Sequence, residues 1–213
     1  GVKTNSKIKG KGKIIRILSN MHQIYHNILA ILSGTEVLDL KFLCEQHSLV
    51  LLQNNVELEE DGEGGERAVF KPDGRLRTHH GHTHHTNQLT LEMTKVMFCA
   101  HKDIQKEIDW FLGQAKTILA QPEGVDPYYA AAYLHFTLIR IHPFADGNGR
   151  TVRLIASMPL LQAGLPPIFV SADHKNAYYD ILMQADRDGD ILPLAGFLEK
   201  ESLQAMKRMI NYK

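Results

Sequence analysis

The residues best suited to chemistry lie in one short segment, which reads HPFADGNGRTVR from His142 to Arg153. Histidine has an ordinary pKa near ~6.5, so His142 is suited to take a proton from a hydroxyl group. Asp146 offers the carboxylate oxygens that Mg²⁺ prefers. Arg150 and Arg153 are three residues apart, so on a helix they share a face and can grip phosphate oxygens.

Small and aromatic residues complete the same segment. Gly147, Asn148 and Gly149 stand at the predicted start of a helix, where backbone N–H groups and the helix dipole favour an anion. Phe144 lies in this mostly polar segment and is predicted to turn inward and anchor the loop on the core. Taken singly, each of these features is typical of a turn, a helix cap or a solvated helix face. Their coincidence within a few residues favours a phosphate-transfer site.

The elements that must position this segment are predominantly helical. Helical spacing of apolar residues predicts helices at about 14–33, 36–55, 88–119, 127–141, 147–163, 174–187 and 191–211. Pro143 is expected to end the helix at 127–141, because proline has no N–H to donate. A small hairpin is predicted from strands at 67–70 and 75–78, joined by the turn Lys71–Gly74. The pattern predicts a mostly α single domain.

Composition excludes several classes of protein. The chain has 213 residues, of which 44% are apolar and 23% charged, and this is typical of a globular domain. The 24 basic residues balance the 24 acidic ones, which argues against a broad electrostatic grip on nucleic acid or anionic lipid. No apolar run reaches ~18 residues, so no membrane span is predicted.

Cysteine usage and the first residue bear on localisation. Cys44 and Cys99 have no CxxC context and are interpreted as free, buried thiols of a reducing compartment, with a disulfide between them as the alternative. The default expectation is a soluble, cytoplasmic protein. Because the chain starts at Gly1 and not at Met, a targeting sequence upstream would not be visible.

Histidine is over-represented, and five of the 12 histidines lie within residues 79–85. Imidazole is a common metal ligand, so a metal site is one hypothesis for this run. No cysteine or spaced helical histidine pair supports it, and an exposed hydrophilic loop tip is the favoured interpretation. Such a tip would gain charge below about pH 6.5.

The segment HPFADGNGR followed by TVR resembles the Fic-family signature, HPFx[D/E]GNGRxxR, with every fixed position present. Weaker similarity covers GRLR at 74–77, which resembles the family's flap, and segments at 161–167 and 178–194. The resemblance spans about residues 70–200. It implies an all-α, Fic-type helical domain with a small β-hairpin flap at about 67–86, within a single domain at 14–213.

The activity that this resemblance implies is protein adenylyltransferase chemistry, AMPylation. AMP would pass from ATP to a Ser, Thr or Tyr hydroxyl of a target protein, with release of pyrophosphate. By position, His142 would be the general base, and Asp146 would bind Mg²⁺ or, alternatively, Mn²⁺. The phosphates would be held by Gly147, Asn148, Gly149, Arg150 and Arg153.

The resemblance also assigns residues outside the phosphate site. Phe144 would be the structural anchor, and adenine would lie near the helix at 178–188. The target protein would lie along the flap residues Arg75, Leu76, Arg77 and Thr83.

Many Fic proteins carry an inhibitory segment, [S/T]xxxE[G/N], whose Glu pairs with the second arginine of the signature. Residues 5–10, within a leader predicted to be flexible over 1–13, resemble it with Lys9 in place of that Glu. Lys9 would repel Arg153, so we expect a form without this inhibition. Misalignment of a lysine-rich leader is the alternative interpretation.

Other functions remain open at the sequence level. The same site could remove AMP from a modified target, or transfer another nucleotide or phosphocholine. A non-catalytic Fic-fold regulatory module is a different class, against which the intact His142 argues. DNA binding by the helices at 14–55 is disfavoured by the balanced charge. The expected partners are ATP and a target protein, with neither nucleic acid nor membrane, and a homodimer is compatible with the resemblance.

Overall fold

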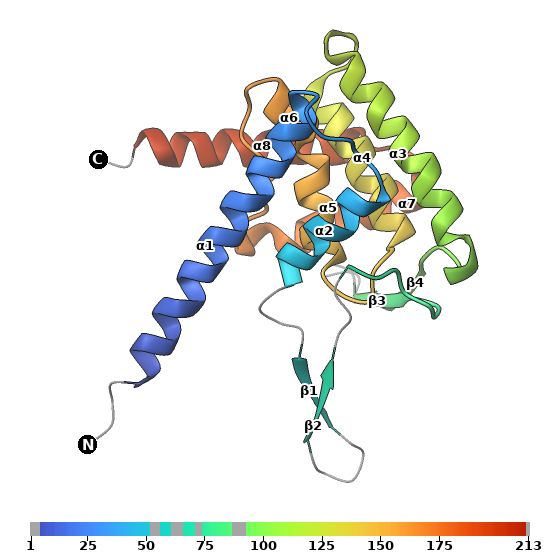
Figure 1. Ribbon diagram of the computed structural model, residues 1–213. Helices are drawn as coiled ribbons and strands as arrows, with labels where there is room; N and C mark the ends of the chain where they lie inside the picture. The colour runs from blue at the N-terminus through green and yellow to red at the C-terminus, as the bar shows by residue number, and fades with distance from the viewer. Residues whose placement is uncertain (1–4, 52–55, 61–65, 71–73, 87–92, 212–213) are drawn as a thin grey trace. The chain divides into compact units, whose positions relative to one another are not determined.

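The structure is a computed structural model that describes residues 5–51, 56–60, 66–70, 74–86 and 93–211 (Figure 1). Side chains are described at 14–51, 74–86, 93–208 and 210–211. The chain divides into two compact units, each described here by itself. The first comprises residues 1–75 with 144–147, and the second comprises 76–143 with 148–213.

The first unit contains two helices and one hairpin. Helices α1 (Asn5–Leu32) and α2 (Leu40–Leu51) pack on each other, and Ile24 and Ile28 of α1 and Leu43 of α2 are buried. Strands β1 (Val56–Glu60) and β2 (Glu66–Phe70) are antiparallel, with Val56 opposite Phe70. The leader predicted at 1–13 is helical from Asn5 onward, so the first helix begins earlier than its apolar pattern indicated.

The start of α2 corrects the predicted helix at 36–55. Asp39 caps this helix, because its carboxylate accepts a hydrogen bond from Phe42 N at 2.8 Å. The Thr35 hydroxyl donates to Ala30 O at 3.0 Å, so this residue closes the end of α1 and does not cap α2. Residues 52–55 of the predicted helix lie outside the described residues.

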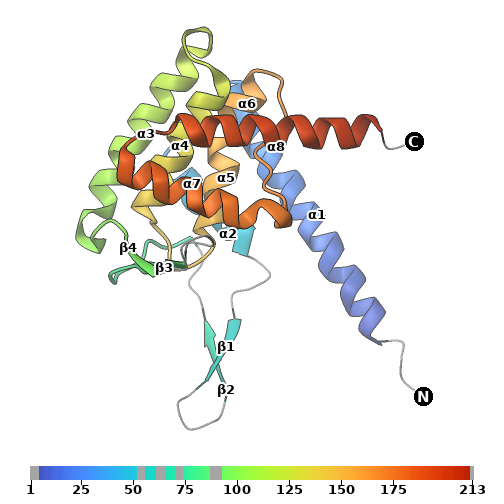
Figure 2. The same cartoon turned by 180° about the vertical axis from the view of Figure 1, so that it is seen from behind.

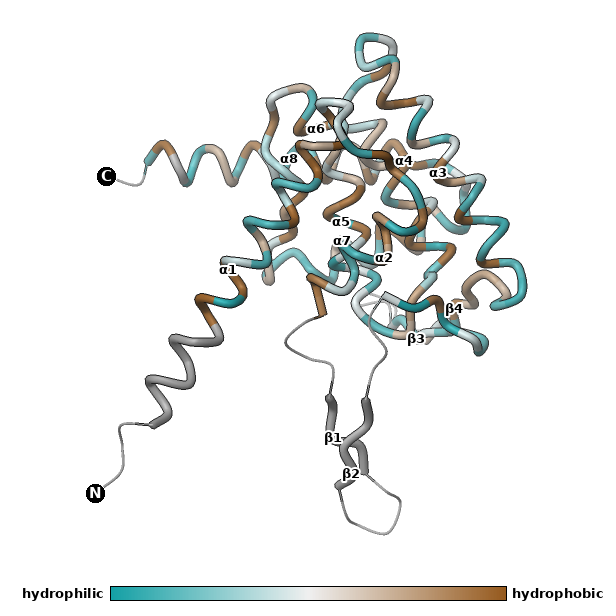
Figure 3. Tube along the Cα trace, viewed as in Figure 1, coloured by the Kyte–Doolittle hydropathy of each residue, from teal (hydrophilic) through white to brown (hydrophobic). Residues whose placement is uncertain are grey.

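The second unit is built around α4 (Pro127–Ile141), against which several other helices pack (Figures 1 and 2). These helices are α3 (Ile104–Ala120), α5 (Asn148–Ala156), α6 (Met158–Gln162) and α8 (Leu192–Ile210), and α7 (Lys175–Asp188) packs on α8. Three buried alanines at 130–132 let neighbouring backbones approach α4 closely. In Figure 3, α3 alternates between hydrophobic and hydrophilic residues, as a helix with one buried face does.

Three short 3₁₀ turns precede helices of this unit, at His101–Asp103, Pro122–Gly124 and Ala172–His174. The helix predicted at 127–141 is confirmed to the residue. The one predicted at 147–163 is divided at Ser157, whose hydroxyl donates to Arg153 O at 2.6 Å and accepts from Ile168 N at 2.9 Å. Pro159, in the first turn of α6, has no N–H for the ladder of α5 to continue.

The predicted hairpin is wrong in its pairing. Strand β2 pairs with β1, and the flap hairpin is formed by β3 (His82–Thr86) and β4 (Met93–Met97), with His82 opposite Met97. Residues 75–78 join neither ladder, because Arg77 N donates to Pro143 O at 2.8 Å. The predicted turn lies outside the described residues except for Gly74, and the helix predicted at 88–119 begins only at Ile104.

In the part of the chain that the structure describes, we find no helix with both the length and the apolar character needed to cross a bilayer.

Candidate active site

His142 lies where α4 ends. Asp126 caps the start of this helix by accepting a hydrogen bond from Tyr129 N at 2.9 Å, and Pro127 follows at its first position. At the other end, His142 has a left-handed backbone with φ of 51°, and its N–H donates to Leu138 O at 3.1 Å. A non-glycine residue in this conformation is uncommon, and it marks a turn that the surroundings constrain.

The His142 ring is held in one orientation. Its Nδ1 lies 3.3 Å from Ile139 O. A carbonyl oxygen only accepts, so Nδ1 carries the hydrogen and the lone pair is on Nε2. One face of the ring stacks on Phe98, with centroids 3.6 Å apart and planes 7° from parallel. The ring therefore has a defined tautomer, as a general base requires.

Arg77 anchors the end of α4 from the side. Its guanidinium donates from Nε to His142 O at 2.6 Å and from Nη2 to Ile141 O at 3.2 Å. It also donates to His79 O at 2.7 Å and to Cys99 O. A cation is favourable there, because the C-terminal end of a helix is the negative end of its dipole. With only 5% of its surface exposed, Arg77 contacts backbone carbonyls here and not the flap surface predicted for it.

A cavity of about 480 Å³ opens beside His142 in the second unit, and its volume is typical of small-molecule sites. Its polar lining includes His142, Gly149 and Arg153. Its remaining walls come from the flap, α4 and α7: His82, Thr83, His84, His85, Val96, Phe98, Phe136, Ile139, Arg140, Tyr178, Tyr179, Leu182, Met183 and Asp186.

The first turn of α5 and Arg153 form the cationic part of this lining. A Cβ placed on Gly149 would lie 3.4 Å from Arg153 Nη1, so the guanidinium folds back along the helix to its first turn. Backbone N–H groups at a helix start and an arginine both favour an anion. Asn148 at the start of α5 is buried, and Arg150 is half-buried on the same helix.

The signature residues 144–147 belong to the first unit, where His47 holds them. The His47 ring stacks on Phe144 with centroids 3.7 Å apart, and Phe144 is buried, as predicted. Gly74 N donates to His47 Nδ1 at 2.9 Å, so Nε2 carries the hydrogen and donates to Asp146 O, also at 2.9 Å. His47 is fully buried, and nothing in its local sequence indicated this role.

Gly147 and Asp146 meet different requirements in this loop. Gly147 has φ of +74°, a backbone conformation that favours glycine, and an added Cβ would lie 2.9 Å from Leu51 Cδ2 and displace that side chain. Asp146 is half-buried. In proteins Mg²⁺ is commonly bound by one or two carboxylates together with the phosphates of the substrate. The Asp146 carboxylate is therefore chemically suited to the predicted Mg²⁺.

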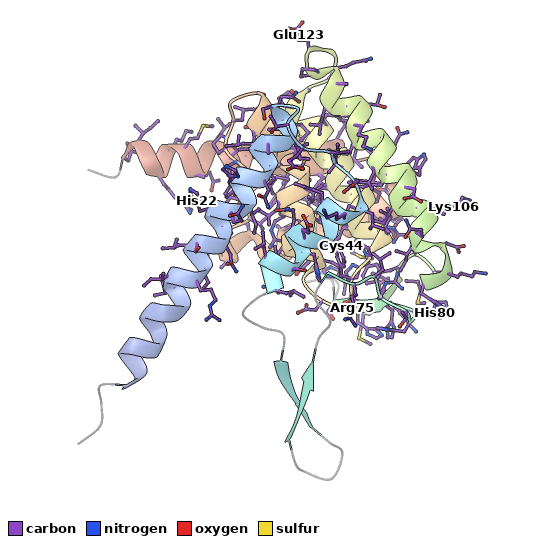
Figure 4. The ribbon with its side chains drawn as sticks, in the orientation of Figure 1. His22, Cys44, Arg75, His80, Lys106 and Glu123 are labelled. Carbon is purple, nitrogen blue, oxygen red and sulfur yellow. The ribbon has the colours of Figure 1, made fainter. Side chains whose placement is uncertain are left out.

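The flap histidines lie mostly in a strand and not at a loop tip. His85 Nε2 lies 2.8 Å from Asp180 Oδ1 of α7, and its ring contacts Tyr179 at a centroid distance of 6.1 Å. Within the described residues, no three His, Cys, Asp or Glu side chains are grouped so as to hold a metal ion. The side chain of His80, labelled in Figure 4 with Lys106 and Glu123, is exposed on the second unit.

The other predicted residues are placed as follows. Thr83 and Arg75 are exposed, and Leu76 is half-buried. Cys44 and Cys99 are free thiols, as expected, although both are only partly buried. The Lys9 side chain lies outside the described residues.

The helical fold and the loop between α4 and α5 define the class of protein. Residues 37–160 match the Fic/DOC family, which is more than half of the chain. The chain therefore belongs to the Fic/DOC family.

Named relatives and solved structures agree with this assignment. The chain is 35% identical over 129 residues to "Protein adenylyltransferase Fic" of Nematostella vectensis, covering 56% of this chain and 29% of that protein. It is 26% identical over 187 residues to "Protein adenylyltransferase fic-1" of Caenorhabditis elegans, covering 88% and 34%. The chain thus spans about a third of the length of these curated relatives.

Two solved structures share the fold. A Fic domain-containing signaling protein from Bacteroides thetaiotaomicron aligns with a TM-score of 0.63 and 22% identity, over 86% of this chain and 60% of that one. Fic-1 from C. elegans aligns with the same TM-score and identity, over 99% and 54%. The all-α Fic fold with a small hairpin flap is therefore confirmed.

Proposed function

We propose that this chain is the catalytic domain of a protein adenylyltransferase, which transfers AMP from ATP to a Ser, Thr or Tyr hydroxyl of a target protein. The observation that carries the proposal is one cavity lined by His142, of defined tautomer, by Gly149 at the start of α5, and by Arg153, whose guanidinium folds back toward that start. The names of the curated relatives support the same activity.

In this reaction His142 acts as the general base. Nε2 accepts the proton of the target hydroxyl while the hydroxyl oxygen bonds to the α-phosphorus and the bond to pyrophosphate breaks. The imidazolium that forms is stabilised, because Nδ1–H donates to Ile139 O and the ring lies at the negative end of the α4 dipole. A base placed in this way contributes about 10²–10⁴-fold in rate.

The start of α5 binds the phosphates. Arg153 and the N–H groups of the first turn favour the negative charge of the β- and γ-phosphates, and Arg150 adds a second guanidinium on the same helix. The apolar part of the cavity, which includes Leu182 and Met183, suits the adenine ring.

Asp146 is the residue that would hold Mg²⁺ or Mn²⁺. It precedes the first residue of α5 by two positions, and its backbone is fixed by the hydrogen bond from His47. A bound divalent ion would neutralise phosphate charge and stabilise the leaving pyrophosphate.

The target protein is proposed to add as a strand beside the flap. Among the described residues β3 pairs on one side only, with β4, so its other edge can accept backbone hydrogen bonds. Thr83 on this strand lines the cavity, and Arg75 and Leu76 precede the strand in the chain.

The test uses ATP labelled at either the α- or the γ-phosphorus, with Mg²⁺ and a lysate as the source of targets. We expect protein labelling from α-labelled ATP only, and its loss in His142→Ala. Labelling from γ-labelled ATP, or undiminished labelling by His142→Ala, would contradict the proposal.

A further inference from the structure

The flap hairpin needs contacts outside its own ladder to keep its position, because a two-stranded hairpin alone is marginally stable in water. Most side chains of β3 and β4 are exposed. Among the described residues of these two strands, Val96 is buried and His85 is half-buried. The contacts of these few inward residues therefore decide where the hairpin lies.

The less exposed face of the hairpin lies against the cavity. Thr83 is opposite Val96 in the ladder, and His85 is two residues from Thr83, so these three side chains share one face. All three line the cavity. Phe98, which follows β4, lines it also and stacks on the His142 ring. The base of the hairpin is thus fixed beside the proposed general base.

His85 provides a second point of attachment, farther along the hairpin. Its Nε2 lies 2.8 Å from Asp180 Oδ1 of α7, and its ring contacts Tyr179 of the same helix. A carboxylate only accepts, so Nε2 carries the hydrogen and donates it. The His85 side chain is 16% exposed and that of Asp180 is 30% exposed, so water competes for this bond only in part. The hairpin is therefore attached to the end of α4 at its base and to α7 at His85.

We propose that His85 and Asp180 are positioning residues, whose hydrogen bond fastens the flap hairpin to α7 and keeps this wall of the cavity closed over a bound nucleotide. Because β3 carries the edge at which the target strand is proposed to add, the same bond keeps that edge in place. Neither side chain takes part in the transfer of AMP, since each acts by holding the hairpin. The inference rests on the proposed function, which places the nucleotide in this cavity.

Hydrogen exchange of backbone amides, measured on the full chain by mass spectrometry, reports how often the hairpin leaves α7. Asp180→Ala removes the acceptor and should lower the protection of β3 and β4 about 5- to 10-fold, the effect of one hydrogen bond. Protection of α3 should not change, whereas a general loss of stability would lower it too. Asp188→Ala is the matched control, because this exposed carboxylate of α7 bonds to its neighbour Arg187, and protection should equal that of the parent chain.

A double-mutant cycle tests whether the effect needs both residues. His85→Phe keeps an aromatic ring beside Tyr179 and removes the donor, so by itself it should lower hairpin protection about as much as Asp180→Ala does. In the Asp180→Ala background it should cause no further loss. His85→Gln, which keeps an N–H donor, should retain more protection than His85→Phe.

Release of nucleotide is the functional readout. The full chain is loaded with methylanthraniloyl-labelled ATP and Mg²⁺ and mixed with excess unlabelled ATP, and the fall in fluorescence gives the dissociation rate. Asp180→Ala and His85→Phe should release the labelled ATP about 5- to 10-fold faster than the parent chain, because the hairpin opens more often. Asp188→Ala should release it at the parent rate.

These outcomes separate the inference from the proposed function, because neither measurement needs transfer of AMP. Unchanged hairpin protection, an equal loss of protection in α3, an additive cycle, or unchanged release of nucleotide would overturn the positioning role. Faster release from the variants of a chain that labels no protein would support the positioning role and overturn the transferase proposal. A parent chain that binds no labelled ATP would overturn both.

Discussion

Arg77 offers the sharpest test of how the fold holds His142, the proposed general base. Arg77→Met keeps the length of the side chain and removes every donor to the carbonyls of His79, Cys99, Ile141 and His142. At roughly 1 kcal/mol for each buried acceptor left without its donor, four acceptors amount to about 4 kcal/mol. For a chain of this size, that corresponds to a fall in melting temperature of about 8–16 °C.

The same substitution should slow the reaction. With its carbonyl released, His142 loses the contact that fixes the end of α4, and displacement of a base by ~1 Å costs about 10²-fold in rate. We expect kcat to fall by one to two orders of magnitude, while AMP affinity changes little because Arg77 does not line the cavity. Arg77→Lys, with three donors, should give an intermediate melting temperature.

Thermal melting followed by circular dichroism, with labelling rates measured at a temperature where both proteins are folded, provides the assay. Arg75→Met is the matched control for stability, since it removes an exposed arginine two residues away and should change the free energy of unfolding by no more than about 0.5 kcal/mol. If Arg77→Met melts within 2 °C of the parent chain, or keeps its full kcat, the argument that Arg77 positions His142 is refuted.

Three further predictions concern other parts of the chain. Gly147→Ala should lower the free energy of unfolding by about 1–3 kcal/mol, because the added Cβ meets Leu51 and the backbone is left-handed; an unchanged urea midpoint would contradict this. Glu201 is buried, which opposes its charge, but a backbone N–H and His174 outweigh this and hold its pKa below 4.5. The ionised Glu201 carboxylate stabilises the fold fully above its unfolded-state pKa, and this stabilisation is lost as pH falls through the folded-state pKa. The difference in melting temperature between the parent and Glu201→Gln should therefore shrink below about pH 4.5. A difference that stays constant with pH would refute this linkage. Lys9→Glu should reduce ATP-dependent labelling, and equal labelling by both chains would show that residues 5–10 are not an inhibitory segment.

Local signals predicted the elements on which the site depends. Helix α4 was predicted at its observed bounds from its apolar spacing and the Pro143 stop. The Asp126 cap and Pro127 at its first position, which the structure shows, are also local to the helix. The inward position of Phe144, an aromatic residue in a mostly polar segment, was also predicted. Strand pairing was predicted wrongly: β2 lies near the expected place but pairs with β1, and a stretch of the expected helix at 88–119 forms β4.

The sequence alone determined which candidate groups lie together. One histidine, one carboxylate, a glycine-rich helix start and two arginines fall within residues 142–153, and residues so near in the chain stay neighbours in any fold. The tertiary structure decided how these groups are held. His47 contacts Asp146 across 99 positions of the chain, Phe98 stacks on His142, and Tyr178 of α7 pairs with His135 of α4. Such contacts leave no periodic trace in the sequence, because a buried hydrogen bond depends on where two distant segments meet and not on the residues beside them.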